Sequence, residues 1–158
     1  MQLTAVSRLA NSLMREHGLI QQGWTFEFDN GRNRAGACRF GTKRITLSRH
    51  LMVNWSENEV RNVILHEIAH AIAGHRAGHG PTWRAHARRI GCTGDRCWTP
   101  SEDAPELEAR WIRVCPNGHY GRKMHRRTDS VRSCAKCSPG RFDDRYLLRT
   151  VPNPAFVG

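Results

Sequence analysis

The stretch "HEIAHAIAGHRAGHGPTWRAH", residues 66–86, places five histidines and one glutamate within 21 positions. Shortly before it, Ser56 is followed three positions later by Glu59, which is the pattern of an N-terminal helix capping box. The apolar residues that follow recur at helical spacing. We therefore predict a helix that begins at Glu57 and ends near Gly74, and that carries the first histidines of the stretch.

On this helix, His66 and His70 would lie about 40° apart, one turn above the other. Two imidazoles in that arrangement can bind one metal ion. Glu67 is offset from His70 by about 60°, so its carboxylate would lie beside the metal and could hold a water molecule without being a ligand. The H-E-x-x-H pattern is typical of zinc peptidases, although a short pattern can also arise by chance on a histidine-rich helix.

A catalytic zinc ion takes three protein ligands, so one more must come from elsewhere in the chain. The candidates are His75, His79, His86 and the downstream glutamates. We favour His79, because the glycine-flanked turn before it can bring the chain back toward the helix. His75 and His86 are expected on a solvated face. Arg76 stands where the metzincin pattern requires a histidine, which excludes that class.

The flanking sequence predicts a small α+β core. Alternating apolar residues and the Asn30-Gly31 pair, a hairpin signal, favour three short antiparallel strands. Cys38, within the second strand, is expected to be a core residue. The expected elements are a helix at 2–17, strands at 24–29, 35–40 and 44–48, and a short helix between Pro81 and Gly91.

The C-terminal cysteines predict a second metal site. Cys134 and Cys137 have the C-x-x-C spacing of a zinc knuckle, and Cys115 and His119 are expected to supply the other half of a closed Cys₃His structural site. His125 is the rival to His119, and a redox or free-thiol pair is the alternative interpretation. Two further cysteines receive no role: Cys92 and Cys97.

The charge distribution favours a polyanionic partner. The formal net charge is +11, and Asp129 is the one acidic residue between positions 110 and 141. Arginine and lysine neutralise phosphates, and the aromatic residues interleaved with them, Trp111, Tyr120 and Phe142, can stack on unpaired bases or pack around the zinc. The expected nucleic-acid contacts are Arg113, Tyr120, Arg122, Lys123, Arg126, Arg127 and Arg132.

These patterns predict four segments: a core at 1–100, an acidic connection at 101–109, a basic zinc-binding module at 110–142 and a loose tail at 143–158. The sequence has no apolar run long enough for a membrane span, and its first residues lack the apolar core of a signal peptide. We therefore expect a cytoplasmic protein with reduced thiols that associates with the nucleoid, or with a host cytoplasm if a phage encodes it.

The combination of H-E-x-x-H with "HGPTW" (79–83) resembles the SprT-like zinc metallopeptidase family, which includes bacterial SprT and the eukaryotic Spartan protease domain. The segment "AGACRFGTKRITLS" (35–48) is similar to the strand pair that precedes the active helix in that family, and the resemblance covers roughly residues 1 to 140. It implies a zincin-like minimal core with a zinc-ribbon-like C-terminal module. It also implies zinc ligands at His66, His70 and His79 and a general base at Glu67.

We therefore expect a DNA-associated zinc metalloendopeptidase that cleaves DNA-bound or DNA-crosslinked proteins. The expected cofactors are one catalytic and one structural zinc ion, and the expected partner is DNA with single-stranded character. A non-catalytic DNA-binding zinc protein is one alternative. A repressor-cleaving regulatory metallopeptidase is another, in which an acidic residue such as Glu102 or Glu106 would be the third ligand. The sequence identifies no residue that would stabilise the tetrahedral oxyanion.

Overall fold

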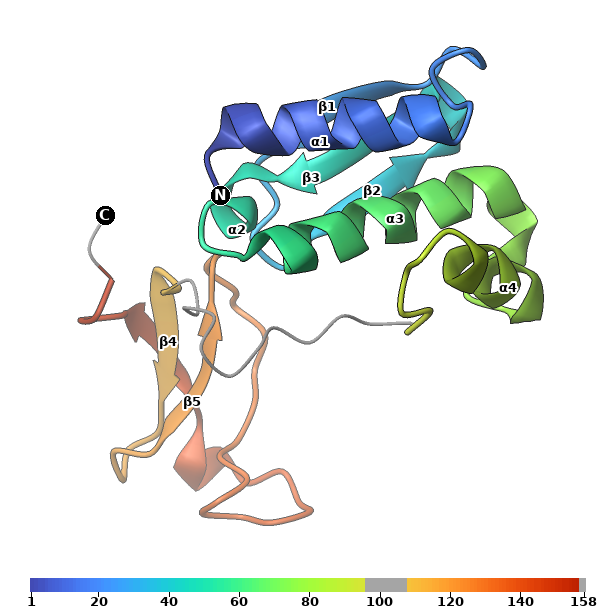
Figure 1. Ribbon diagram of the computed structural model, residues 1–158. Coiled ribbons are helices and arrows are strands. Elements are labelled where there is room, and N and C mark those ends of the chain that lie inside the picture. Colours follow the sequence, from blue (N-terminus) through green and yellow to red (C-terminus); the bar gives the residue numbers. More distant parts are fainter. Residues whose placement is uncertain (96–107, 157–158) are drawn as a thin grey trace. The chain divides into compact units, whose positions relative to one another are not determined.

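The computed structural model of the protein describes residues 1–95 and 108–156 (Figure 1). The chain divides into two compact units, Met1–Pro105 and Glu106–Gly158. The first unit combines helices with a three-stranded sheet, and the second is built on another three-stranded sheet, so the predicted α+β class is confirmed. None of the described helices is both long enough and apolar enough to cross a membrane.

In the first unit, helices α1 and α3 pack against each other and against the sheet (Figure 1). The buried face of α1 consists of residues at helical spacing, Val6, Ala10 and Leu13, and these join Ile64 and Ile68 of α3 in one apolar core. The elements, in chain order, are α1 (Leu3–Glu16), β1 (Thr25–Asp29), β2 (Gly36–Arg39), η1 (Phe40–Thr42), β3 (Arg44–Ser48), α2 (Arg49–Met52), α3 (Glu57–Ala73), η2 (His75–Ala77) and α4 (Pro81–Arg89).

The sheet of the first unit is mixed, so the expectation of three antiparallel strands was wrong. The strand order is β1-β3-β2, with β3 parallel to β1 and antiparallel to β2. β3 takes the central place because four of its five residues are buried. The strands β1 and β2 run in opposite directions, as in a hairpin, but β3 lies between them. Six residues, 30–35, therefore cross about two strand spacings, roughly 10 Å, which a two-residue hairpin loop cannot do.

The start of α3 is fixed by the predicted capping box. The Ser56 hydroxyl accepts a hydrogen bond from the Glu59 backbone N–H at 3.4 Å, and the Glu59 carboxylate accepts one from the Ser56 N–H at 2.7 Å. Both bonds satisfy N–H groups that have no partner within the helix. The capping box therefore fixes where α3 begins and stabilises its first turn. His66 and His70 lie further along the same helix.

The second unit contains strands β4 (Trp111–Val114), β5 (Tyr120–Met124) and β6 (Arg149–Pro152), with a short turn η3 (Asp144–Tyr146). Its order is β5-β4-β6, and both pairings are antiparallel. The expectation of a loose tail at 143–158 was wrong, because β6 completes this sheet and pairs Val151 with Ile112. Most of the predicted acidic connection, together with Cys97, Glu102 and Glu106, lies outside the described residues.

Candidate active site

Three histidine side chains converge at the C-terminal half of α3. The Nε2 atom of His79 lies 3.1 Å from Nε2 of His66 and 3.0 Å from Nε2 of His70. His66 and His70 come from successive turns of one helix, whereas His79 comes from the turn that follows it. The structure therefore brings together the three imidazoles that the sequence predicts as ligands.

Two glycines allow the chain to return to the helix within five residues. α3 ends at Ala73, and Gly74 has a φ angle of 86°. After the single turn η2, Gly78 has a φ angle of 49° and a ψ angle of −133°. Residues with a Cβ rarely adopt such conformations, so glycine at both positions makes the reversal possible. His79 consequently faces back toward the helix it has just left.

Trp83 on α4 forms the apolar support of the histidine cluster. Its side chain is fully buried, and its ring centroid lies 4.8 Å from that of His66, 5.2 Å from that of His70 and 4.6 Å from that of His79. The His70 ring is stacked on it with an interplanar angle of 27°. One indole ring therefore limits the rotation of all three imidazoles.

The donor set fits a tetrahedral metal ion. Zn–N bonds of about 2.0–2.1 Å at tetrahedral angles place the ligand nitrogens about 3.3 Å apart, close to the observed separations of 3.0 and 3.1 Å. Burial, together with the charges of the neighbouring histidines, lowers the pKa values of His66 and His70 to about 4. Both rings are therefore neutral at physiological pH, which is the state that binds a metal ion.

Glu67 lies buried beside this cluster against strand β2. Gly36 approaches it so closely that a Cβ at position 36 would lie 2.9 Å from both Cγ and Oε1 of Glu67. Burial raises the pKa of Glu67 to about 8, while the charge of Arg34 and a hydrogen bond from the backbone N–H of Cys38 act in the opposite direction. A divalent cation on the adjacent imidazoles would favour the ionised carboxylate further, because opposite charges stabilise each other.

A cleft with a volume of about 520 Å³ opens onto the histidines and Glu67. The sequence did not predict several of the residues that line this cleft. Cys38, expected in the core, is half-buried and lines the cleft, and burial raises the pKa of its thiol to about 12. His75 is exposed, as expected, and it also lines the cleft, with its ring 5.3 Å from that of Phe40. The signal that could have revealed these walls is the strand "AGACRF" (35–40), which supplies four of the lining residues.

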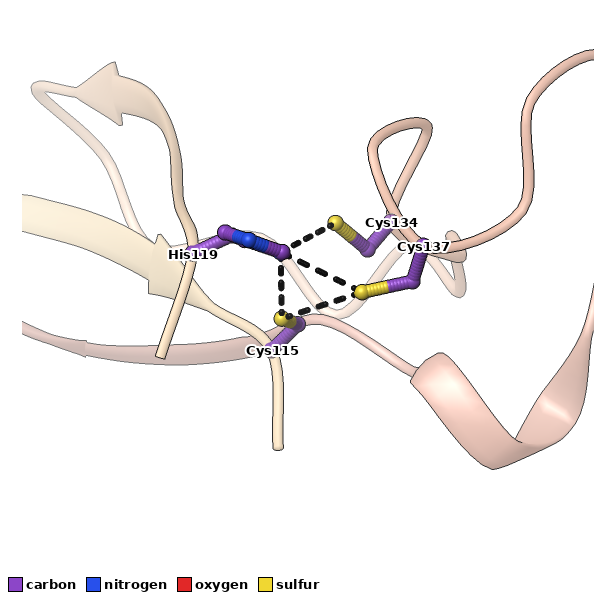
Figure 2. Close-up of side chains that lie close together, drawn as sticks. All are labelled: Cys115, His119, Cys134 and Cys137. Carbon is purple, nitrogen blue, oxygen red and sulfur yellow. Dashed lines mark hydrogen bonds between the residues drawn. The ribbon is translucent and has the colours of Figure 1, made fainter. Parts of the chain in front are cut away.

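The second cluster of possible ligands lies in the second unit (Figure 2). The Nδ1 atom of His119 is 3.6 Å from the sulfur of Cys115, 3.7 Å from that of Cys134 and 3.2 Å from that of Cys137. The sulfurs of Cys115 and Cys137 are 3.9 Å apart. Tetrahedral zinc with Zn–S bonds of about 2.3 Å requires about 3.6 Å between sulfur and nitrogen and about 3.8 Å between sulfurs. The four side chains therefore fit a closed Cys₃His site.

Among the described residues, the structure places His119 rather than its rival His125 in this group. A hydrogen bond from the backbone N–H of Cys137 is the main cause that lowers the pKa of the Cys134 thiol, to about 6. A thiolate at neutral pH is the form that binds a metal ion. Cys115 follows β4, and Cys134 and Cys137 belong to a separate turn, so the cluster links two segments of the second unit.

Of the expected nucleic-acid contacts, Arg113 is buried, Lys123 is partly buried and the other five are exposed. Arg113 is buried, with its Nη2 donating to the carbonyl and hydroxyl oxygens of Ser130 at 3.0 and 2.6 Å, so its assignment to a nucleic-acid surface was wrong. The Nζ atom of Lys123 lies 3.0 Å from the Glu108 carboxylate. The remaining expected contacts are exposed: Tyr120, Arg122, Arg126, Arg127 and Arg132.

A cleft that joins an H-E-x-x-H helix, a third convergent histidine and a buried glutamate defines a metallopeptidase. The family model for the SprT-like family matches residues 6–104, and the chain belongs to this family. The predicted family and enzyme class are thereby confirmed.

Among solved structures, the chain is similar to the crystal structure of the metallopeptidase zymogen jannalysin of Methanocaldococcus jannaschii. The identity is 20%, the TM-score is 0.47, and the match covers 56% of this chain and 83% of that chain. A comparison with curated proteins found no match.

Proposed function

We propose that the protein is a zinc-dependent endopeptidase that cleaves proteins bound or crosslinked to DNA. The single observation that carries the catalytic part is the convergence of three imidazoles. Nε2 of His79 lies 3.1 Å from Nε2 of His66 and 3.0 Å from Nε2 of His70, and Glu67 lines the same open cleft. His66, His70 and His79 would hold the zinc ion. When bound, this ion would acidify a water molecule and polarise the peptide carbonyl.

Glu67 would act as the general base and then as the general acid. Its carboxylate accepts a proton from the attacking water and later delivers that proton to the leaving amine. Gly36 and the Cys38 N–H hold the carboxylate against β2, so it is oriented before the substrate binds. β2 is at the edge of the sheet and lines the cleft, and an extended peptide could bind alongside it.

The catalytic part is tested by replacing Glu67 with glutamine. We expect proteolysis to fall by at least a hundredfold while zinc content stays unchanged, because glutamine cannot transfer the proton. Full proteolysis by this variant would contradict the proposal.

A second experiment tests the third ligand. Replacing His79 with alanine should remove the zinc ion of this site, whereas loss of zinc from Glu102→Ala or Glu106→Ala would favour a regulatory peptidase with an acidic third ligand.

Support for a DNA partner comes from the second unit. The four exposed arginines Arg122, Arg126, Arg127 and Arg132 accompany the exposed aromatic rings of Tyr120 and Phe142, which are 64% exposed each. Cations beside accessible rings are the combination that binds unpaired nucleotides. The same proposal places the enzyme in the cytoplasm, on the nucleoid or on the DNA of a phage-infected host.

The DNA part is tested by measuring cleavage of casein and of histones with and without single-stranded DNA. We expect DNA to stimulate histone cleavage, and the double variant Arg122→Gln/Arg126→Gln to lose that stimulation while casein cleavage without DNA is unchanged. The matched control is Arg8→Gln/Arg15→Gln, which removes the same charge from exposed positions of α1. Cleavage by wild type that DNA does not alter would contradict this part. DNA binding without any proteolysis would favour the non-catalytic alternative.

A further inference from the structure

The segment that leads into β2, together with the first residue of that strand, lines part of the cleft. Asn33, Arg34, Ala35 and Gly36 all line the cleft that contains the histidines and Glu67. Among the described residues that line it, Arg34 is the only arginine or lysine. The reaction described above develops negative charge on the peptide oxygen, and Arg34 is the permanent cation of this cleft.

The structure holds Arg34 in place through a carboxylate that is itself fixed from two sides. The Nη2 atom of Arg34 donates to the Asp29 carboxylate at 2.6 Å. That carboxylate also accepts hydrogen bonds from the buried Thr46 hydroxyl at 2.7 Å and from the Gly31 backbone N–H at 2.8 Å. Hydrogen bonds from Thr46, Gly31 and Arg34 outweigh the effect of burial and lower the pKa of Asp29. Asp29 is therefore a permanent anchor for the guanidinium.

Within this pair, the Arg34 side chain is the more exposed of the two. The Asp29 side chain is 17% exposed and that of Arg34 is 41% exposed, so the carboxylate lies inward and the cation outward. The loop packs tightly around them, since a Cβ on Gly31 would lie 2.9 Å from Oδ1 of Asp29 and 3.5 Å from Cγ of Arg34. A guanidinium has five N–H donors. The hydrogen bond to Asp29 uses one N–H of Nη2, so other N–H groups of Arg34 can donate to a substrate oxygen.

Arg34 is also close to the base along the chain. Gly36 packs directly against Glu67, and two residues of extended chain span at most about 7 Å, so the backbone of Arg34 lies within that distance of Gly36. The long side chain of an arginine reaches several ångströms further. The charge of Arg34 also acts on the Glu67 carboxylate, and both residues line the cleft, so the guanidinium and the base are close enough to act on one bound peptide.

We propose that Arg34 is a catalytic residue of the peptidase, which donates hydrogen bonds to the scissile carbonyl oxygen as that oxygen becomes negatively charged, and that Asp29 is its positioning residue. The oxygen of water bonds to the carbonyl carbon, the π electrons move to the carbonyl oxygen and the water proton passes to Glu67. When the tetrahedral intermediate collapses, the C–N bond breaks and the nitrogen takes that proton. Arg34 stays protonated throughout. This proposal rests on the metallopeptidase activity proposed above.

The test compares Arg34→Gln, Arg34→Lys and Asp29→Asn with wild type, all loaded with zinc. For Arg34→Gln we expect kcat to fall by about 10²–10³-fold with little change in KM, because the contact is strongest in the transition state. Arg34→Lys should recover part of the rate, and Asp29→Asn should lose a smaller part than Arg34→Gln. The matched control Arg15→Gln alters an exposed arginine of α1 outside the cleft lining and should keep wild-type kinetics.

A binding measurement separates this role from a structural one. A phosphinic peptide, whose tetrahedral phosphorus and charged oxygen mimic the intermediate, should bind Arg34→Gln more weakly by the same factor as kcat/KM falls. The uncleaved substrate peptide should bind Glu67→Gln and Glu67→Gln/Arg34→Gln equally well. Wild-type kcat in Arg34→Gln, or an equal loss of affinity for the substrate and the phosphinic peptide, would overturn the inference. Cleavage by wild type that stops in Glu67→Gln verifies the proposed function separately.

Discussion

Close packing between Gly36 and Glu67 restricts which side chain position 36 can carry. The carboxylate of Glu67 occupies the space where any other residue at position 36 would carry its Cβ. The same burial that orients this carboxylate also raises its pKa to about 8. Ionising Glu67 therefore lowers the stability of the metal-free folded protein. Each of these two properties leads to a separate prediction.

Replacing Gly36 with alanine should lower kcat by about tenfold to a hundredfold, because a displacement of the base by a fraction of an ångström to one ångström disturbs proton transfer. Zinc content should stay at the wild-type value, since the histidines lie on other elements. Steady-state kinetics and metal analysis check this. Gly41→Ala is the control, because a Cβ there meets no atom within 4 Å. Wild-type kcat in Gly36→Ala would show that the contact does not position Glu67.

Replacing Glu67 with glutamine should change the pH dependence of stability in the metal-free protein. The folded protein keeps Glu67 protonated up to about pH 8, whereas the unfolded chain ionises it near its ordinary pKa of 4.5. The unfolded state thus binds fewer protons, and wild-type stability falls as pH rises between these values. Relative to wild type, Glu67→Gln should gain on the order of 2–4 kcal/mol between pH 5 and pH 8. Urea unfolding at both pH values measures this, with Glu16→Gln as the exposed control; parallel pH profiles for Glu67→Gln and wild type would contradict it.

At the scale of elements, α3 and the turn that follows it carry the ligands of the candidate site. The helix contributes two imidazoles and the base, and Gly74 and Gly78 return the chain so that His79 completes the set. The stability of α3 begins with its capping box, and the second unit depends in a similar way on its last strand. Both elements can be altered without touching any candidate ligand.

Replacing Ser56 with alanine should lower the free energy of unfolding by about 1 kcal/mol, because it leaves N–H groups of the first turn without a partner. Zinc content should be unchanged, as His66 lies ten residues further along the helix. Chemical denaturation measures the loss. Ser12→Ala, an exposed position within α1, is the control and should be close to neutral. An equal effect of both substitutions would show that the cap contributes nothing specific.

Removing residues 149–158 should abolish metal binding by the second unit. β6 pairs with β4, which leads directly into Cys115, so its loss leaves one edge of β4 without hydrogen bonds. Cobalt substitution reports this, because thiolate ligands give charge-transfer absorption that an all-histidine site lacks. A chain that lacks only residues 157–158 is the control and should keep the full absorption. Full absorption in the longer truncation would contradict the role given to β6.

At the scale of the whole molecule, the two units each bring together their own group of possible ligands. The histidine cluster has an open cleft beside it, and the Cys₃His cluster supplies four ligands by itself. An open position suits catalysis and a closed one suits structure. The molecule is therefore expected to bind two zinc ions with different roles, one in each unit.

Replacing Cys134 with serine should lower the zinc content from about two to about one ion per chain, because a closed structural site tolerates the loss of a ligand poorly. Cleavage of a short peptide should stay within about twofold of wild type, while stimulation of histone cleavage by single-stranded DNA should be lost. Cys92→Ser, at a buried cysteine outside both clusters, is the control and should retain two ions. One zinc ion in wild type, or loss of peptide cleavage in Cys134→Ser with the histidine-bound ion still present, would contradict the division of roles.

Much of this molecule could be read from local patterns. The capping box of Ser56, the apolar face of α3 and the spacing of His66 and His70 depend on neighbouring residues within a helix, so the sequence is sufficient to predict them. The spacing of the C-terminal cysteines likewise indicated their grouping. Burial of an arginine was not visible in this way, because Arg113 has the same local signature as the exposed arginines around it.

What the sequence by itself determined is therefore the chemistry carried on one helix, its start and the residues able to join it, because hydrogen bonds and periodicity along a helix are local. Only the tertiary structure decided that β3 separates β1 from β2, that β6 completes the second sheet, that Gly36 packs against Glu67, and that Arg34, paired with Asp29, lines the same cleft. Those arrangements depend on which distant segments bury each other's surface, and the free energy of that burial belongs to the assembled core rather than to any single stretch of the chain.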